Sequence, residues 1–321
     1  EERNLKPVTA NVSLREEKPK KIRDMVVGIF FEDISYAADG GLYGELLQNR
    51  DFEYDPADRN GRDKNWNSTY AWSVKGSNAT FSIDTVKPIH KNNRHYAVLD
   101  AKSKDAGLAN MGYDGISVKK GEKYDVSLFA RGVNGNKTKL IIRLQDRKGD
   151  VIGETVTGGI SSEWKKLQTV ITAKSTNAEA LLVVIPQNQG KLNLDFISLF
   201  PQNTFMKRKN SLRADLAQVI ADMKPRFVRF PGGCVAHGDG LDNMYRWSRT
   251  VGPLESRVQQ PNIWHYHQSA GLGYFEYFQF CEDIGAEPLP VMAAGVPCQN
   301  SSANANGIGG QQGGIPMDKM P

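Results

Sequence analysis

The residues from 211 to 234 constrain the fold of this 321-residue chain more than any other segment. Between 211 and 223, apolar residues recur at the spacing of a helix that packs one face against a core. A short apolar strand over 227–230 follows, and then the turn Pro231-Gly232-Gly233. A helix, a strand and a glycine turn in this order are typical of a βα-barrel, in which the loop after each strand carries the chemistry.

Three further segments have the patterns expected for strands and helices of such a barrel. The nearly continuous apolar run over 25–31 predicts a strand buried on both faces, and it ends in the carboxylates of Glu32 and Asp33. A helix over 274–284 stops before Gly285, and a strand over 287–294 follows it. These segments supply about three of the eight strands of a (β/α)8 barrel, so we predict an incomplete TIM barrel.

Residues from about 50 to 200 have a different pattern. Short runs of alternating apolar and polar residues are separated by turns rich in Gly, Asn and Lys, which predicts an antiparallel β-sandwich of jelly-roll type. The runs are 79–83, 95–99, 124–130, 139–144, 166–172, 180–185 and 192–200. Trp72 and Trp164 lie beside such runs, and we expect both in the sandwich core. The fold class is therefore multidomain: α/β plus all-β.

These patterns divide the chain into four parts. Residues 1–20 hold an alternating run over 7–16, which predicts a strand with one face in solvent. Residues 21–48 hold the first barrel strand and its turn, and residues 49–201 form the inserted sandwich. Residues 202–321 continue the barrel as helix, strand, helix and strand, and they end in the start of the next loop.

The composition excludes several classes of function. Forty-one Lys and Arg against 36 Asp and Glu give a net charge of +5, but the basic residues are spread thinly. Without a basic patch interleaved with aromatic residues, we predict no nucleic-acid binding. No apolar run approaches the roughly 20 residues of a membrane helix, so we predict no membrane span. The three cysteines form neither a disulfide framework nor a Cys-x-x-Cys zinc pair.

Four motifs in order resemble glycoside hydrolase family 51, which consists mainly of α-L-arabinofuranosidases. They are Gly-Ile-Phe-Phe-Glu-Asp at 28–33, Gly-Leu-Tyr-Gly-Glu-Leu at 41–46, Arg-Phe-Pro-Gly-Gly-Cys at 229–234 and Gly-Pro-Leu-Glu-Ser-Arg at 252–257. The similarity covers about 1–50 and 200–300. It implies that the strand over 7–16 joins a β-sandwich completed by C-terminal sequence that the chain lacks. The block between them resembles a jelly-roll carbohydrate-binding module inserted after the first barrel strand.

The resemblance implies a retaining glycosidase that releases α-L-arabinofuranosyl residues from arabinan, arabinoxylan or their oligosaccharides and needs no cofactor for catalysis. Retention requires two carboxyl groups about 5–5.5 Å apart. In this family one belongs to an Asn-Glu pair and the other is a second Glu near the end of the barrel. The dipeptide Asn-Glu occurs nowhere in the chain. Both catalytic carboxylates are therefore expected beyond Pro321, and the chain alone is expected to be inactive.

The same resemblance assigns four residues to substrate binding. Glu32 would accept hydrogen bonds from sugar hydroxyls, although an acidic cap or an ion pair with a barrel arginine such as Arg229 is the alternative. Arg229 would orient carboxylates of the site, including the acid/base. Cys234 would line the sugar subsite. Trp264 would shape the pocket or stack on a sugar face, and plain loop packing is the alternative.

Related modules also suggest a structural calcium ion. Glu53 and Asp195 lie at the two ends of the inserted block and would supply hard oxygen ligands, unless they are ordinary surface carboxylates. We expect a secreted or periplasmic protein rather than a cytoplasmic one, and association into a homo-oligomer stays open. Two other functions stay open as well: a non-catalytic carbohydrate-binding protein acting through 49–201, and another retaining glycosidase, such as a xylosidase or an endoglucanase.

Overall fold

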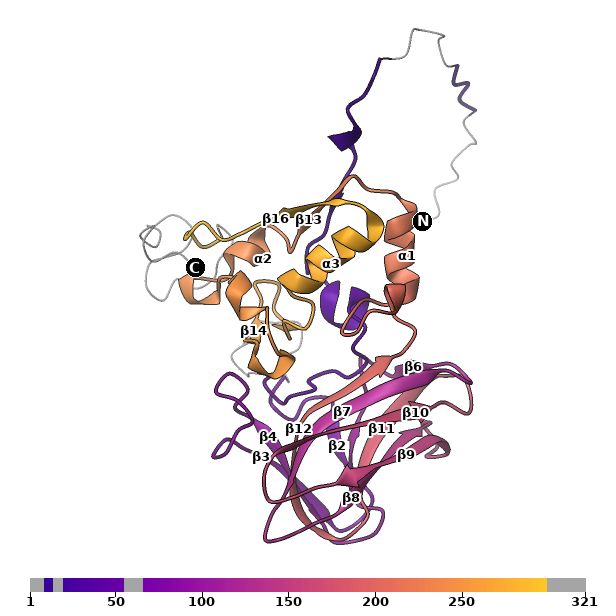
Figure 1. Ribbon diagram of the computed structural model, residues 1–321, viewed down its shortest axis with the longest axis vertical. Coiled ribbons are helices and arrows are strands. Elements are labelled where there is room, and N and C mark those ends of the chain that lie inside the picture. The colour runs from indigo at the N-terminus through magenta and orange to yellow at the C-terminus, as the bar shows by residue number, and fades with distance from the viewer. Residues whose placement is uncertain (1–8, 14–19, 55–65, 299–321) are drawn as a thin grey trace, which may run out of the picture.

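The computed structural model of the chain describes residues 9–13, 20–54 and 66–298. Figure 1 shows two parts stacked along the long axis, a mixed α/β part at the top and a sandwich of strands below. The chain forms the first strand of the α/β part, passes through the whole sandwich, and then returns to complete the α/β part. The sandwich therefore interrupts the α/β part.

The α/β part is built on a small parallel sheet. Its strands β1 (Ile29–Phe30), β13 (Phe227–Phe230) and β16 (Glu287–Pro290) lie in that order. Helices α1 (Ala214–Asp222) and α3 (Tyr274–Ile284) contribute side chains to the core on one face of the sheet. The buried members of that core include Leu212, Ala217, Val228, Phe230, Tyr274, Tyr277, Phe280 and Cys281.

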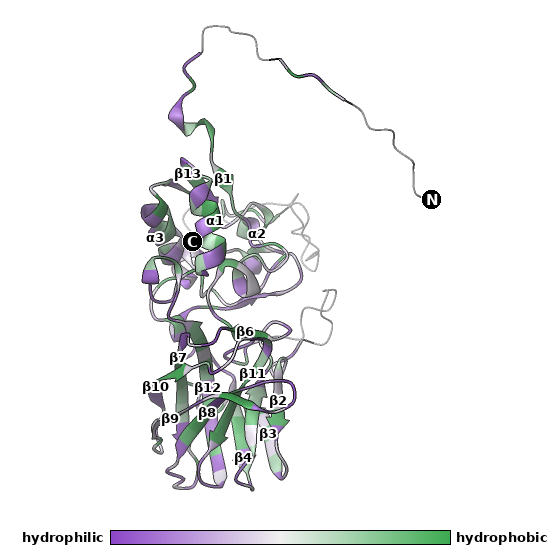
Figure 2. Cartoon of the chain, turned by 90° about the vertical axis from the view of Figure 1, so that its right-hand side faces the viewer, coloured by the Kyte–Doolittle hydropathy of each residue, from purple (hydrophilic) through white to green (hydrophobic). Residues whose placement is uncertain are grey.

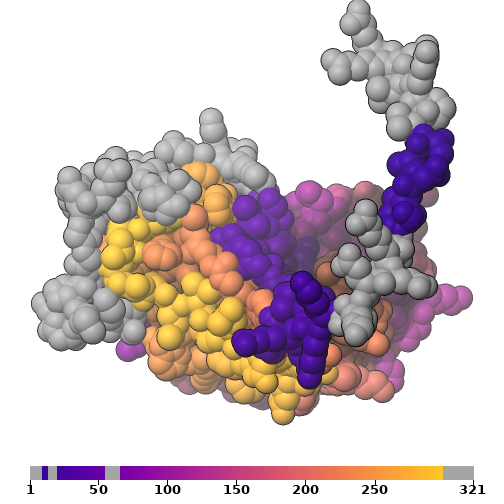
Figure 3. Space-filling model, turned by 90° about the horizontal axis from the view of Figure 1, so that it is seen from above, coloured from indigo at the N-terminus to yellow at the C-terminus, as the bar shows by residue number. Residues whose placement is uncertain are grey.

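The opposite face of this sheet is open. Phe30, Arg229 and Leu289 are direct neighbours across the three strands and form one row on this face. Phe30 and Leu289 are 50% and 47% exposed, although both are large and apolar. In Figure 3 the indigo N-terminal segment lies against orange and yellow segments from the end of the chain, so distant parts of the sequence build this region together.

The α/β elements match the sequence expectations unevenly. Helix α3 has the expected bounds, and Gly285 ends it in the left-handed conformation (φ 66°) that glycine favours. Helix α1 begins later than expected, because Arg213 and not Ser211 precedes its first turn. The strands expected over 25–31 and 287–294 form only at 29–30 and 287–290, where β13 supplies a pairing partner. Residues 24–26 form a short 3-10 helix instead.

The inserted part is an antiparallel sandwich of two sheets, as expected. One sheet has the order β10-β7-β12-β4-β3, and the other has the order β2-β5-β11-β8-β9 with β6 beside β11. The strands are β2 (Trp72–Lys75), β3 (Ala79–Asp84), β4 (Tyr96–Ala101), β5 (Gly107–Asn110), β6 (Ile116–Val118), β7 (Lys123–Gly132), β8 (Lys139–Gln145), β9 (Val151–Gly159), β10 (Lys165–Thr172), β11 (Asn177–Pro186) and β12 (Gly190–Pro201). Green apolar and purple polar residues mingle along these strands in Figure 2.

Alternation along each strand explains the sandwich core. In β7 every second residue is buried, and Val126, Leu128 and Ala130 enter the space between the sheets. Trp72 joins that core, as expected. The expectation for Trp164 is wrong: it is only half-buried, and its indole N–H donates to the carbonyl of Lys87 at 2.7 Å. The side chain lies outside the core because its ring packs against the guanidinium of Arg131, 5.0 Å from the ring centre, on the outer face of the sheet.

Short elements complete the described chain. They are η1 (Asp24–Val26), η2 (Ala38–Leu42), η3 (Phe205–Lys207), α2 (Cys234–His237), η4 (Leu241–Asn243), η5 (Trp247–Arg249), η6 (Leu254–Ser256), β14 (Gln260–Pro261) and β15 (His267–Gln268). Residues 9–13 form no strand, and the rest of the strand expected over 7–16 lies mostly outside the described residues. None of the described helices has the length and apolar character needed to cross a membrane.

Candidate functional site

The carboxyl ends of the three parallel strands meet at one edge of the sheet. Backbone hydrogen bonds continue the pairing past the strand ends, from Phe31 N to Arg229 O (2.8 Å), from Asp33 N to Pro231 O (3.1 Å) and from Val291 N to Phe230 O (2.7 Å). Ligands of open α/β sheets bind at this end of the strands. The sequence predicted Glu32 and Cys234 at the same place.

Glu32 is held firmly at this edge. Its Oε1 accepts hydrogen bonds from the backbone N–H groups of Gly233 (3.1 Å) and Val235 (3.3 Å), at the start of α2. The side chain is half-buried. Its other oxygen, Oε2, accepts no hydrogen bond from any residue that the structure describes. Glu32 thus caps the 232–235 turn through one oxygen, which is the acidic-cap alternative, and its role as an acceptor for a sugar hydroxyl stays a prediction.

The turn opposite Glu32 requires glycine at position 232. A Cβ on Gly232 would lie 2.6 Å from Cγ of Glu32 and 2.4 Å from Cγ1 of Val235, which is closer than atoms in contact can approach. A Cβ on the neighbouring Gly233 would lie no nearer than 3.8 Å to Nη2 of Arg229. The first glycine therefore allows the carboxylate to approach the turn, and the second does not serve this purpose.

Cys234 lies at the same edge as Glu32. It is the first residue of α2, between the two residues whose N–H groups bind the carboxylate, and it is half-buried. No disulfide joins the three cysteines, all of which the structure describes. The structure thus brings Glu32 and Cys234 together, as the sequence predicted.

Arg229 points to the open face of the sheet. Its guanidinium lies over the ring of Phe30, 4.2 Å from the ring centre, and the side chain is half-buried. No ion pair between Arg229 and Glu32, or any other described carboxylate, is present. The alternative reading of Glu32 as the ion-pair partner of Arg229 is therefore not supported, and the orienting role of the arginine stays a prediction.

Trp264 lies at the tip of the hairpin formed by β14 and β15. The side-chain oxygen of Asn262 accepts the backbone N–H of Trp264 at 2.9 Å and shapes this tip. The Trp264 ring packs against a cluster of buried aromatic residues. Its indole nitrogen is buried and has no hydrogen-bond partner among the described residues. Loop packing is thus visible, and contact with a sugar stays a prediction.

Sequence reasoning missed Asp33 as a structural centre of the site. Its Oδ1 accepts the hydroxyl of Tyr266 at 2.8 Å, and its Oδ2 accepts the side-chain amide of Gln268 at 2.9 Å. Burial, with a smaller contribution from the charge of Asp39, raises the pKa of Asp33 to about 6. The signal was present in the sequence, because two adjacent carboxylates end a buried strand, but only Glu32 was assigned a role.

Asp39 makes a second connection to the same hairpin. It accepts hydrogen bonds from the backbone N–H (2.6 Å) and the hydroxyl (2.7 Å) of Ser269. Burial raises the pKa of Asp39 as well. The two carboxylates therefore hold the residues that follow Trp264 against the end of β1.

Glu53 and Asp195 lie near a third carboxylate, Asp51. Burial and the charge of Glu53 raise the pKa of Asp51 to about 7, and burial and the charge of Asp51 raise the pKa of Asp195 well above its usual value. Oδ1 of Asp51 and Oδ2 of Asp195 are buried without a hydrogen-bond partner in the described chain. Glu53 instead accepts the backbone N–H of His95 at 2.6 Å and contacts its Nδ1 at 2.8 Å, which raises the pKa of His95.

This arrangement does not by itself form a metal centre. Within the described ranges, no group of three or more His, Cys, Asp or Glu is placed to hold a metal ion. Two buried and unpaired carboxylate oxygens are nevertheless chemically suited to a hard cation. Asp51 and His95 are members of this cluster that the sequence did not identify.

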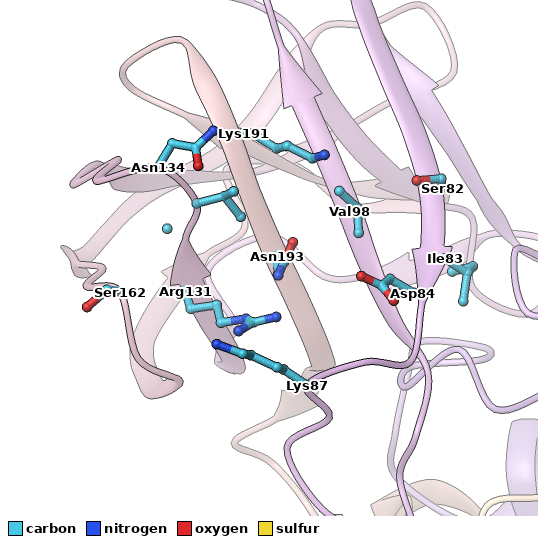
Figure 4. Close-up of a pocket in the computed structure, with 12 residues that line it drawn as sticks. Ser82, Ile83, Asp84, Lys87, Val98, Arg131, Asn134, Ser162, Lys191 and Asn193 are labelled. Carbon is cyan, nitrogen blue, oxygen red and sulfur yellow. The ribbon is translucent and has the colours of Figure 1, made fainter.

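The sandwich carries a groove of about 500 Å³ on the outer face of its five-stranded sheet. Ser82, Val98, Asn193 and Arg131 are successive neighbours across β3, β4, β12 and β7 and form its floor. Figure 4 shows Asp84, Lys87 and Arg131 converging around Asn193 on this face.

An aromatic and charged network holds Arg131, which lines the groove. The guanidinium of Arg131 lies over the rings of Tyr96 (5.3 Å) and Trp164 (5.0 Å). The hydroxyl of Tyr96 donates to Asp84 at 2.8 Å and accepts from Arg131 at 3.1 Å. The groove thus offers hydrogen-bond donors and acceptors of both charges, and the rings of Tyr96 and Trp164 pack against its Arg131.

Two protein-family models match the chain. A carbohydrate binding domain matches residues 44–191, and an α-L-arabinofuranosidase 1 domain matches residues 219–312. The chain is 39% identical to an extracellular exo-α-L-arabinofuranosidase of Streptomyces chartreusis over 86% of the chain and 33% of that protein. It is 33% identical to α-L-arabinofuranosidase 1 of Arabidopsis thaliana over 90% of the chain and 43% of that protein.

A solved structure gives the same relationship. The arabinose-bound form of a family 51 α-L-arabinofuranosidase superimposes with a TM-score of 0.79 at 30% identity, over 88% of this chain and 46% of that one. The chain thus spans between a third and a half of the length of these relatives. Over most of its length the chain is therefore homologous to the N-terminal portion of α-L-arabinofuranosidases of glycoside hydrolase family 51, and it includes a carbohydrate binding domain.

Proposed function

We propose that the chain is the N-terminal, substrate-binding part of a retaining glycosidase that releases α-L-arabinofuranosyl residues from arabinan, arabinoxylan or their oligosaccharides. The observation that carries this proposal is the position of Glu32 and Cys234 at the shared carboxyl edge of β1 and β13. The family relationship supplies the reaction class. No cofactor takes part in the proposed hydrolysis.

The three parallel strands are proposed to be the first strands of a (β/α)8 barrel. The open row of Phe30, Arg229 and Leu289 supports this, because its two large apolar side chains are about half exposed. Closing the barrel would bury such a row in one of the layers that fill a barrel interior. Arg229 would then face the other inward-pointing side chains and could orient carboxylates among them.

Glu32 and Cys234 are proposed to form one wall of the subsite. Oε2 of Glu32 would accept a hydrogen bond from a sugar hydroxyl, since Oε1 is already engaged by the turn. A charged acceptor makes a stronger hydrogen bond than a neutral one. Cys234 would contact the sugar through its side chain, and Trp264 would border the pocket.

The acid/base and the nucleophile are proposed to lie beyond Pro321. The absence of an Asn-Glu pair from the sequence supports this placement, as does the fraction of the relatives that the chain spans. Glu32 and Asp33 do not substitute for the pair, because one is bound to the 232–235 turn and the other is buried beneath the 262–268 hairpin.

The experiment compares this chain with a version extended beyond Pro321 on 4-nitrophenyl α-L-arabinofuranoside. We expect hydrolysis by the extended protein and none by the 321 residues alone. Hydrolysis of both at the same rate would disprove the placement of the catalytic pair. The corresponding β-D-xyloside and a soluble cellulose derivative separate an arabinofuranosidase from a xylosidase or an endoglucanase.

The groove of the sandwich favours a second function, binding of the polysaccharide outside the catalytic site. Its polar lining groups suit the hydroxyls of a neutral sugar chain, and the half-buried ring of Trp164 lies against Arg131, one of those groups. Titration of this chain with arabinan and arabinoxylan tests the proposal, with Lys191→Ala in the groove and Lys139→Ala on the other sheet as control. We expect Lys191→Ala alone to weaken binding. Equal affinity of both variants, or no binding at all, would refute it.

We further propose a structural calcium ion near Asp51 and Asp195, with Glu53 at its margin. The support is the pair of buried, unpartnered carboxylate oxygens described above. A bound cation would stabilise both carboxylates in the charged form. The relative from Streptomyces chartreusis is named an extracellular enzyme, which supports a secreted or periplasmic location for this protein. Light scattering on the purified protein decides whether it forms a homo-oligomer.

A further inference from the structure

We propose that the inserted sandwich is a positioning part of the substrate site. Aromatic residues at the start of the insertion support the hairpin that carries Trp264, and Asp33 fastens that hairpin beside Glu32. The proposal rests on the function proposed above, because it concerns the geometry of that same site. It assigns the insertion a structural role that is independent of whether its groove binds sugar.

The first step is an aromatic cluster shared by the two parts of the chain. Tyr54 and Trp66 come from the region that matches the carbohydrate binding domain, and Tyr266 comes from the hairpin. All three are at most 4% exposed and form one core. Partly buried residues that pack against them are Tyr36, Tyr70 and Trp264. We call these six residues the aromatic seam.

The rings of the seam are stacked and ordered. Tyr54 stacks on Trp66 with ring centres 4.5 Å apart, and on its other neighbour, His267, at 4.8 Å. Tyr266 stacks on Tyr36 at 4.5 Å. Aromatic pairs of this kind stabilise their arrangement beyond the burial of their surface. Residues of the insertion therefore lie directly against the hairpin, at the positions next to Trp264.

The second step links the hairpin to the site. The ring of Tyr266 packs in the seam, and its hydroxyl donates a hydrogen bond to Asp33. Asp33 also binds Gln268, and its own backbone N–H continues the pairing of β1 with the segment that carries Gly232. Movement of the hairpin would therefore displace Asp33, which is adjacent to Glu32 in the chain.

The hairpin is anchored at both ends and along its tip. Its base is bound by Asn243, whose side-chain nitrogen donates to Pro261 O, and its far end is bound by Asp39 at Ser269. Between these points, Tyr266 packs in the seam and binds Asp33, and His267 stacks on Tyr54 of the insertion. Residues of the insertion therefore take a direct part in holding the hairpin that carries Trp264.

This dependence matters because a binding wall works only when its groups are held to about 0.5 Å. Tyr54, Trp66, Tyr266 and Asp33 are buried and would not touch the sugar. They are positioning residues, and loss of any of them should loosen the hairpin before it unfolds the protein.

The test uses three substitutions. Trp66→Leu removes the stacking partner of Tyr54, whereas Trp66→Phe keeps a ring there and removes no hydrogen bond to the described residues. Tyr266→Phe keeps its ring and removes only the hydroxyl that binds Asp33. Tyr124→Phe is the control, because Tyr124 is also a buried tyrosine with a bonded hydroxyl but lies in the sandwich core.

Two measurements are made on each variant. Hydrogen exchange of the 260–270 amides is followed in the 321-residue chain, and KM and kcat for 4-nitrophenyl α-L-arabinofuranoside are measured in the protein extended past Pro321. We expect Trp66→Leu and Tyr266→Phe to speed exchange of these amides and to raise KM about tenfold, with a smaller change in kcat. Trp66→Phe and Tyr124→Phe should resemble the unsubstituted protein.

The proposal is overturned if Trp66→Leu and Tyr266→Phe show the exchange pattern of Tyr124→Phe. If Trp66→Leu does not fold, Tyr266→Phe decides by itself, because it removes a single hydroxyl. Should the extended protein lack arabinofuranosidase activity, the proposed function fails, yet the exchange measurement still decides whether the insertion supports the hairpin.

Discussion

Oε1 of Glu32 accepts the backbone N–H of Gly233 at 3.1 Å, across 201 residues of sequence and the whole inserted sandwich. This hydrogen bond joins the end of the first parallel strand to the turn after the second. It requires the carboxylate to approach the turn closely, and this approach depends on Gly232. The two sides of the candidate subsite are thereby fixed relative to each other before any ligand binds.

Gly232→Ala should disrupt this arrangement. A methyl group there would overlap Cγ of Glu32 and Cγ1 of Val235, so one of the two must move. We expect a loss of roughly 1–3 kcal/mol in the free energy of unfolding, measured by urea denaturation. Gly233→Ala is the matched control, because its methyl group meets no atom closer than 3.8 Å and φ of −116° suits alanine. Equal losses for the two variants would contradict the close approach.

Asp33 should make stability depend on pH. Burial raises its pKa from 3.8 to about 6, so the folded chain holds the proton that the unfolded chain releases. The resulting stabilisation is complete below pH 3.8 and is lost as the pH rises through about 6, by about 3 kcal/mol at 1.4 kcal/mol per pKa unit. Asp33→Asn should therefore flatten the fall in unfolding free energy between pH 4 and 7.

The comparison must be made as a difference between the two proteins, because burial also raises the pKa values of Asp39, Asp51 and Asp195 and gives slopes of the same sign. Asparagine suits the site, since Oε1 of Gln268 is buried without a partner among the described residues and could accept the new N–H. Parallel pH profiles for the two proteins would show that Asp33 is not the group responsible.

Calcium should stabilise the chain if the proposed site exists. A ligand that binds only the folded state adds about 2.7 kcal/mol at a hundred times its Kd. We therefore expect a higher melting temperature in calcium than in EDTA, and no such difference for Asp195→Asn. Asp100→Asn, in the same sheet, is the control and should keep the response. An unchanged melting temperature in calcium would leave protonation of Asp51 and Asp195 as the explanation of their burial.

Loss of the buried ion pair between Arg257 and Glu276 should lower the free energy of unfolding far more than loss of an exposed ion pair. Arg257 binds both oxygens of Glu276 at 2.9 Å, and each side chain is at most 5% exposed. Removing one buried partner leaves an uncompensated charge, so we expect Arg257→Met to cost about 3–5 kcal/mol in chemical denaturation. Arg143→Met breaks the more exposed pair with Glu154 and should cost at most about 1 kcal/mol. Similar costs would contradict this difference in burial.

Much of the fold could be predicted because the spacing of apolar residues along an element reflects which of its side chains are buried. The alternation along β7 and the helical spacing of 274–284 each describe one buried face, and both elements form as expected. The strand lengths could not be predicted for 25–31 or 287–294, because a strand extends only as far as its neighbour pairs with it. The prediction that Trp164 lies in the sandwich core was wrong for a related reason. The alternation along a strand does not determine which face of the sheet a residue just outside the strand will cover.

The candidate site was predicted only in part. Glu32 and Cys234 follow from strand ends and family motifs, and the structure places them together. Asp33 and the aromatic seam depend on contacts between residues up to 235 positions apart, and no local pattern encodes such contacts. Burial of Asp51 beside Asp195 depends in the same way on how the two ends of the insertion meet.

The kinetics of Glu32→Gln test the proposed binding wall most directly. Glutamine keeps an oxygen for the N–H groups of Gly233 and Val235 but removes the charge offered to a sugar hydroxyl. In the protein extended past Pro321, kcat/KM for 4-nitrophenyl α-L-arabinofuranoside should fall roughly tenfold to a hundredfold, as for loss of a hydrogen bond to a charged group, while the melting temperature hardly changes. An unchanged kcat/KM in the folded variant would contradict the assignment of Glu32 to the substrate.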